Sequence, residues 1–189
     1  MPSATIARST ADTAGDFLAL IKPRVTALVI ATTAGGFWLA PAQPSAVSFL
    51  LALVGVVLLV GAANTFNMYL ERDVDALMKR TKNRPLPAKR LAPETAFTFG
   101  LLLAAVSIVI LTIGVNPLTA LLGVISFILY VFFYTPLKQK TTMALLIGAI
   151  PGAMPPLMGW TAATNRLDLQ GLSLFLILFA WQLPHFLAI

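Results

Sequence analysis

The sequence predicts an all-α fold, a multi-pass transmembrane helical bundle, and two observations carry this prediction. Of its 189 residues, 58% are hydrophobic and only 11% are charged, whereas a soluble domain carries about 25% charged residues. Six separate apolar stretches approach the length of about 20 residues that a helix needs to cross a bilayer. A soluble domain of this length cannot bury so much apolar surface. Composition therefore excludes a soluble enzyme, a disordered tail and a collagen-like rod.

The six expected spans cover residues 25–42, 47–70, 95–115, 118–137, 143–162 and 172–189. Pro23 suits the first turn of the first helix because proline has no N–H group to leave unpaired. The fifth stretch holds three prolines and three glycines, which predict a broken or bent helix. These residues are Pro151, Pro155, Pro156, Gly148, Gly152 and Gly159. Irregular backbone at membrane depth is tolerated where it is buried in protein or lines a cavity.

Basic residues predict the orientation of the bundle. All but one of the thirteen Lys and Arg residues fall on the side shared by the amino terminus, the 71–94 connection and the connection after residue 137; the exception is Arg166. The positive-inside rule places that side in the cytoplasm. Residues 1–16 form a polar tail without the apolar core of a signal peptide. The chain stops inside an apolar run, so we expect 17–189 to be the N-terminal part of a longer transmembrane domain.

The most informative polar cluster lies at the end of the second span. Asn67, Glu71 and Asp75 recur every four residues. On a continuous helix their side chains share one face, within an arc of about 80°, and Asp73 points elsewhere. Such oxygen ligands suit Mg²⁺, which takes one or two protein carboxylates together with substrate phosphates. Carboxylates at membrane depth are costly and usually functional, so this face is the candidate metal site.

Four bases follow the acidic face: Lys79, Arg80, Lys82 and Arg84. Cations of this kind bind phosphate, and an Arg fork does so through paired oxygens. The alternative is that these loop charges only anchor the helix end. An acidic face and a basic loop beside an apolar bundle favour a substrate with a diphosphate head and an apolar tail.

The acidic run and the following KRTKNRP at 79–85 resemble the first acidic motif of the UbiA-type intramembrane prenyltransferases. Three further segments, KPRV at 22–25, PGAMPPLMGW at 151–160 and WQLPHF at 181–186, are similar to the protohaem IX farnesyltransferase (haem O synthase) branch of that family. The family usually has Asp where this chain has Glu71, and the longer carboxylate can still bind Mg²⁺. The family's second acidic motif belongs to a later loop. The resemblance therefore places that motif beyond Ile189 and implies that these residues alone are inactive.

The resemblance implies transfer of a farnesyl group from farnesyl diphosphate to a vinyl group of haem B, with addition of water, giving haem O and diphosphate. It assigns Mg²⁺ to Asn67, Glu71 and Asp75, with Asp73 as a helper, and the diphosphate to Arg80 and Arg84, then Lys79 and Lys82. Lys138, in a Tyr-x3-Lys element after Tyr134, completes the catalytic set by reaching the diphosphate from across the bundle. Alternatively, Lys138 anchors a helix end, and Tyr130 and Tyr134 belong to an interfacial aromatic belt.

His185 and Trp181 are the candidate haem contacts. They lie four residues apart on a helix kinked by Pro184, which puts them on one face. A neutral imidazole is a natural ligand for haem iron. The alternatives are a histidine that hydrogen-bonds across the bundle and a tryptophan, like Trp160, that only packs.

Three other functions stay open. One is a prenyltransferase of the same family that acts on an aromatic or quinone-precursor acceptor. The second is a membrane transporter, which requires charged or broken-helix sites near the midplane. The third is a non-catalytic assembly subunit. The resemblance implies farnesyl diphosphate, haem B and the lipid bilayer as partners, and no nucleic acid. Haem A synthase or terminal-oxidase assembly factors are further candidates, and the expected location is the cell inner (plasma) membrane with a cytoplasmic N-terminus.

Overall fold

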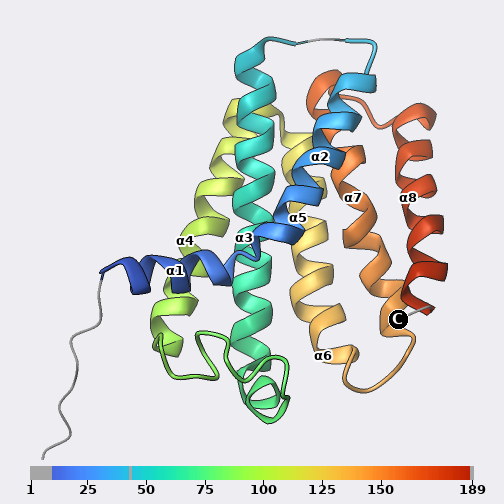
Figure 1. The fold of residues 1–189 in the computed structure, drawn as a ribbon. Coiled ribbons are helices and arrows are strands. Elements are labelled where there is room, and N and C mark those ends of the chain that lie inside the picture. Colours follow the sequence, from blue (N-terminus) through green and yellow to red (C-terminus); the bar gives the residue numbers. More distant parts are fainter. Residues whose placement is uncertain (1–9, 43, 188–189) are drawn as a thin grey trace, which may run out of the picture.

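A computed structural model describes residues 10–42 and 44–187, and the side chains of residues 13–42 and 44–184. Helices joined by short connections make up this part of the chain (Figure 1). The elements are α1 (Thr10–Leu20), α2 (Pro23–Leu39), α3 (Ala46–Leu77), α4 (Pro93–Val109), η1 (Ile110–Val115), α5 (Pro117–Ile128), η2 (Leu129–Tyr134), α6 (Thr135–Leu137), α7 (Ala144–Thr164) and α8 (Leu169–Leu187), where η marks a π-helical stretch. The expected all-α bundle is confirmed, and α1 begins inside the stretch expected as a polar tail.

Four helical segments are long and apolar enough to cross a membrane: α3, α4 with η1, α5 through α6, and α7. Helices α1 and α2 meet at an angle of 49° and together form a fifth candidate span. Helix α8 is apolar but short over Leu169–Pro184. The expectation of six spans is therefore slightly too high for the described residues. The first and last apolar stretches are the ones that fall short, because α2 has only 17 residues without α1 and the described part of α8, Leu169–Pro184, is too short.

Helix α3 carries the acidic face beyond the apolar part of the bundle. Its 32 residues extend about 48 Å at 1.5 Å per residue, whereas the hydrocarbon core of a bilayer is about 30 Å thick. The helix starts at a Ser45 cap, whose side chain accepts a hydrogen bond from the Ser48 amide at 3.2 Å. Its charged end lies at the same end of the bundle as the α6–α7 connection, opposite the α2–α3 connection (Figure 1). Charged loops thus gather at one end.

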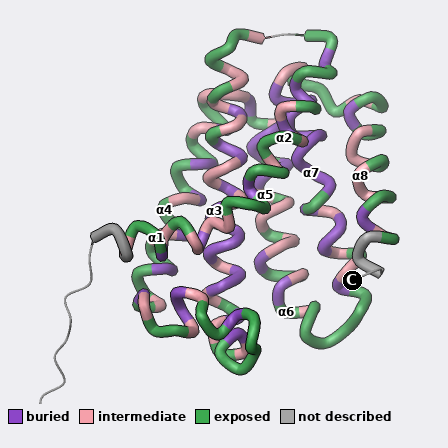
Figure 2. The backbone as a smooth tube through the Cα atoms, viewed as in Figure 1, coloured by how far each residue is buried: buried purple, intermediate pink, exposed green. Residues whose placement is uncertain are grey.

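Helix α7 is the central helix of the bundle. In its most apolar window 72% of the residues are buried, against 28–39% for the other three spans, and Figure 2 shows this burial along α7. It packs against α2, α5 and α8. A Cβ atom at Gly36 would overlap the carbonyl oxygen of Pro156, and one at Gly159 would overlap that of Thr33. The backbones of α2 and α7 therefore touch, which only glycine permits.

The prolines of α7 do not break it. The helix is continuous from Ala144 to Thr164 across Pro151, Pro155 and Pro156, so of the expected break or bend, the break does not occur. Each proline removes one backbone hydrogen bond. Close packing by α2, α5 and α8 holds the chain helical in spite of this loss, since a bundle tolerates proline where neighbouring helices support it.

A polar network joins α5 to α7 at the end opposite the charged loops. The Asn116 side chain caps α5 by accepting from the Thr119 amide at 2.8 Å and donates to the Thr161 carbonyl at 2.9 Å. The Thr119 and Thr161 hydroxyl groups lie 2.9 Å apart. These buried contacts satisfy polar groups that lipid could not. They hold both helices in register, and so help to position the site at the other end.

Candidate active site

The chain turns sharply at Lys22, between α1 and α2. Lys22 has φ 51°, in the left-handed region, which costs a non-glycine residue about 1–3 kcal/mol. Pro23 then begins α2. The carbonyl of Ile21 accepts from the Thr26 hydroxyl at 2.8 Å and from the Asn64 amide at 3.3 Å. These contacts hold the turn, and the turn carries the lysine to α3.

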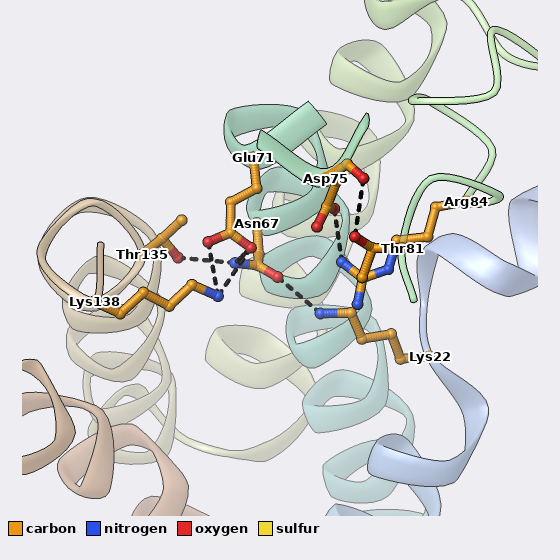
Figure 3. A network of polar contacts seen from close by, with 8 residues as sticks. All are labelled: Lys22, Asn67, Glu71, Asp75, Thr81, Arg84, Thr135 and Lys138. Atoms are coloured by element: carbon orange, nitrogen blue, oxygen red, sulfur yellow. Dashed lines mark hydrogen bonds and ion pairs between the residues drawn. The ribbon is translucent and has the colours of Figure 1, made fainter. Parts of the chain in front are cut away.

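Asn67, Glu71 and Asp75 form one buried face of α3, as expected. Their exposed fractions are 1%, 6% and 4%, and their side chains lie on the same side in Figure 3. The Asn67 amide donates to Glu71 Oε2 at 3.0 Å and to Thr135 Oγ1 at 3.3 Å. The Asp73 side chain is 85% exposed. It lies off this face because the helix continues through it.

Each member of this face meets a cation from a different part of the chain (Figure 3). Lys22 Nζ donates to Asn67 Oδ1 at 2.8 Å. Lys138 Nζ, just after α6, lies 2.7 Å from Glu71 Oε1. Arg84, in the loop after α3, pairs with Asp75. We call these three residues of α3 and their three cations the charged cluster: Lys22, Asn67, Glu71, Asp75, Arg84 and Lys138.

The loop after α3 brings only one of its four predicted phosphate ligands into the charged cluster. Arg84 Nη1 lies 2.7 Å from Asp75 Oδ2. The Thr81 hydroxyl donates to the Asp75 backbone carbonyl at 3.0 Å, which turns the loop back over the helix end. The other three predicted ligands are exposed, and their side chains make no hydrogen bond or ion pair inside the described part of the chain: Lys79, Arg80 and Lys82.

Lys22 is the member of the charged cluster that the sequence reasoning did not assign. The signals were a lysine just before the proline that opens an apolar stretch and its place in the KPRV segment at 22–25, which resembles the family. Burial lowers the pKa of Lys22 to about 8, and the positive charges of Arg84 and Lys138 act in the same direction, while Glu71 and Asp75 oppose them. An added anion here would favour the charged form of the lysine.

The donor set of the α3 face fits Mg²⁺. It offers two carboxylates and a carboxamide oxygen, and magnesium is usually held by one or two carboxylates, waters and substrate phosphates. The described residues contain no cluster of three or more His, Cys, Asp or Glu that could hold a metal. Phosphate oxygens would therefore have to complete the shell. In this structure Glu71 and Asp75 face cations. Once Mg²⁺ bound these carboxylates, the same cations would be available to bind a phosphate.

An apolar cavity of about 300 Å³ adjoins the charged cluster. Its walls come from α2, α3, α5, η2, α7 and α8, and none of its lining side chains among the described residues carries a charge. Asn64 lines it three residues before Asn67, and Tyr134 lines it one residue before Thr135. The same two elements thus pass from the cavity into the charged cluster. Gly148 makes room for the Tyr134 ring, which a Cβ atom would meet at 2.5 Å.

Of the two predicted haem contacts, the structure describes the side chain of Trp181 but not that of His185. Trp181 is 59% exposed on α8, and Trp160 is buried on α7 against Gly171. The α8 residue that lines the cavity is Gln182, which is 7% exposed and which the sequence reasoning did not single out.

Comparison with known proteins gives relatives over most of the chain. The protoheme IX farnesyltransferase of Myxococcus xanthus is 52% identical over 183 residues, which are 97% of this chain and 62% of that protein. The human mitochondrial protoheme IX farnesyltransferase is 46% identical over 178 residues, which are 94% of this chain and 40% of that protein. The chain therefore spans about three fifths of the length of its bacterial relative.

Two solved structures share the fold. One, a digeranylgeranylglyceryl phosphate synthase, superposes with a TM-score of 0.79 at 17% identity, over 89% of this chain and 59% of that one. The other, a UbiA homolog from Archaeoglobus fulgidus bound to DMAPP and Mg²⁺, gives a TM-score of 0.75 at 17% identity, over 90% and 62%. The sequence profile of the UbiA prenyltransferase family matches residues 28–189. With this match, and with its close relatives over almost its whole length, the chain belongs to the UbiA prenyltransferase family.

Proposed function

We propose that the protein transfers a farnesyl group from farnesyl diphosphate to a vinyl group of haem B, giving haem O and diphosphate. The observation that carries the proposal is the charged cluster beside an uncharged apolar cavity. An isoprenoid diphosphate has the same division, with an anionic head and an apolar chain. The choice of farnesyl donor and haem acceptor is supported by the names of relatives that are 46–52% identical to this chain.

The charged cluster suits the diphosphate head. Breaking the allylic C–O bond leaves the bonding electrons on diphosphate, so the main catalytic demand is stabilisation of that departing charge. Fixed cations in a partly dry site do this well, because they need no reorganisation as the charge develops. Lys22, Arg84 and Lys138 hold the required charges within one cluster. The exposed Lys79, Arg80 and Lys82 would attract the anion to the site.

Asn67, Glu71 and Asp75 would hold Mg²⁺. When bound, the ion supplies Lewis-acid charge to the diphosphate oxygens. The binding of Mg²⁺ with DMAPP by a UbiA homolog of the same fold supports this assignment at the level of the family. Asp73 is exposed beside Arg72 at 3.9 Å, so we leave it out of the metal site.

The cavity suits the apolar part of the reaction. Most of its wall residues are apolar, such as Val29, Leu59 and Met158, and none carries a charge, so they limit the access of bulk water to an allylic cation. The chain would act as a multi-pass protein of the cell inner (plasma) membrane. Its N-terminus would lie in the cytoplasm, at the end where basic residues gather. The tail of residues 1–16 would then precede the transmembrane domain on that side.

Mass spectrometry of haem tests the proposal directly. The gene is expressed through its natural stop codon, and haem is extracted from the membranes. A farnesyl adduct of haem B, abolished by Asp75→Asn, is the expected result. Unchanged haem B in membranes that contain the well-expressed protein would contradict the haem assignment. The same membranes would then be supplied with aromatic acceptors, which separates a different acceptor from the lack of any transferase activity.

A further inference from the structure

Gln182 presents an amide group to the apolar cavity. Its side chain is 7% exposed and lines the cavity from α8. A Cβ atom at Gly152 would overlap Gln182 Oε1, with the carboxamide carbon and nitrogen each 3.0 Å away. The amide therefore packs against α7 with its oxygen nearest to Gly152, in a notch that only glycine leaves open.

This amide has no hydrogen-bond partner in the described part of the chain. A carboxamide can donate two hydrogen bonds and accept two, so this amide is available to a polar molecule that enters the cavity. The other carboxamide on the cavity wall, Asn64, already donates to the Ile21 carbonyl at 3.3 Å. Of these two amides, Gln182 is thus the one available to bind a molecule inside the cavity.

The position of Gln182 narrows the choice of partner. Tyr134, beside the charged cluster, packs on Gly148, whereas Gln182 packs on Gly152. Gly148 and Gly152 are one helical turn apart on α7, about 6 Å along the axis. Gln182 therefore lies deeper than the end of the cavity where the diphosphate would sit. A group held there is kept away from the C–O bond that breaks.

We propose that the Gln182 carboxamide binds the water molecule whose oxygen becomes the hydroxyl group of the product. This inference rests on the proposed function. Among the groups that react, the vinyl group and the isoprenoid chain offer an amide no hydrogen bond, whereas the added water can both donate to the amide oxygen and accept from the amide nitrogen.

The step balances without another reactant. The farnesyl C–O bond breaks and its electron pair leaves with diphosphate. The vinyl π electrons form the new C–C bond, which leaves a cation on the vinyl carbon next to the macrocycle. A lone pair of the bound water attacks that carbon and forms the new C–O bond. The protonated alcohol is a strong acid and gives its proton to the released diphosphate, so Gln182 orients the water and need not act as a base.

The test is the composition of the product. Without an oriented water, the cation loses a proton instead and yields an alkenyl adduct that is lighter by one water molecule. Gln182→Leu should lower the ratio of hydroxylated to alkenyl adduct about tenfold, the effect of about one hydrogen bond, with a smaller change in their sum. Gly152→Ala should move the ratio in the same direction, because it displaces an intact amide. Gln170→Leu, at an exposed position of the same helix, should leave the ratio unchanged.

The other outcomes are decisive as well. An unchanged ratio with a lower total would overturn the inference, because it is what a packing role predicts. Loss of both adducts in well-expressed Gln182→Leu and Gly152→Ala proteins would also overturn it, since water adds after the C–C bond has formed. If the unaltered protein makes neither adduct, the proposed function itself fails, and this inference falls with it.

Discussion

The ammonium of Lys138 lies 2.7 Å from Glu71 Oε1 and 2.8 Å from Oε2. The pair joins two residues 67 positions apart, and it brings the end of α6 onto the acidic face of α3. The Lys138 side chain is 29% exposed and that of Glu71 is 7% exposed. The lysine is therefore bound within the site. A residue that only anchors a helix end at the membrane surface would not make this contact.

Lys138→Met should lower the rate of prenyl transfer about 100-fold, the typical cost of removing one group that stabilises developing negative charge. Methionine keeps most of the apolar stem, so the change is mainly one of charge. Release of diphosphate by purified protein measures the rate. Lys140→Met, two residues later and exposed, is the matched control and should stay within about twofold of the unaltered protein, as surface substitutions usually do. Equal effects of the two substitutions would exclude a specific role for Lys138.

Asp75→Asn should abolish measurable transfer, whereas Asp73→Asn should retain it. The first substitution removes a buried carboxylate that faces Arg84 at 2.7 Å, and loss of one partner of such a pair is strongly unfavourable. The second alters a side chain that is 85% exposed. Diphosphate release measures transfer in both variants, and in the Asp73→Asn protein it also gives the Mg²⁺ concentration for half-maximal release. A higher requirement in the Asp73→Asn protein would restore that residue to the metal site.

Arg84→Gln should weaken binding of the prenyl diphosphate more than Arg80→Gln. Both arginines are predicted phosphate ligands, but only Arg84 reaches the charged cluster. A charge-assisted hydrogen bond contributes about 1.5–3 kcal/mol, so the KM of the Arg84→Gln protein should rise about tenfold or more. Arg80→Gln should change KM mainly at low salt, because an exposed charge acts at a distance that salt screens. The reverse order of effects would show that the loop rearranges around the substrate.

The acidic face was predictable because it depends on local periodicity alone. Asn67, Glu71 and Asp75 share a face whenever the helix runs through them. Their spacing of four residues predicts this directly. The difference between Arg84 and Arg80 was not predictable. It depends on how the loop turns, and the turn depends on the hydrogen bond from Thr81 to a backbone carbonyl at the end of α3.

The contributions of Lys22 and Gln182 were hidden for a different reason. Lys22 meets Asn67 across 45 residues of sequence, and Gln182 meets Gly152 across two packed helices. Neither contact follows from a spacing within one helix. The number of spans was set slightly too high because α2 counts as a span only together with α1, and because α8 is short over Leu169–Pro184.

Gly36→Ala should destabilise the bundle, whereas its neighbour Gly35→Ala should not. A Cβ atom at Gly36 would overlap the carbonyl of Pro156 on α7, while one at Gly35 would have no atom within 4 Å. Forcing α2 and α7 apart should cost about 1–3 kcal/mol, the usual cost of overpacking. Gly35→Ala should be neutral or stabilising by up to about 1 kcal/mol, since alanine is the better helix former. Thermal unfolding of the two purified proteins in one detergent measures the difference in Tm. An unchanged Tm for Gly36→Ala would mean that α2 and α7 do not touch there, and would withdraw the support that holds the proline-rich α7 continuous beside the cavity.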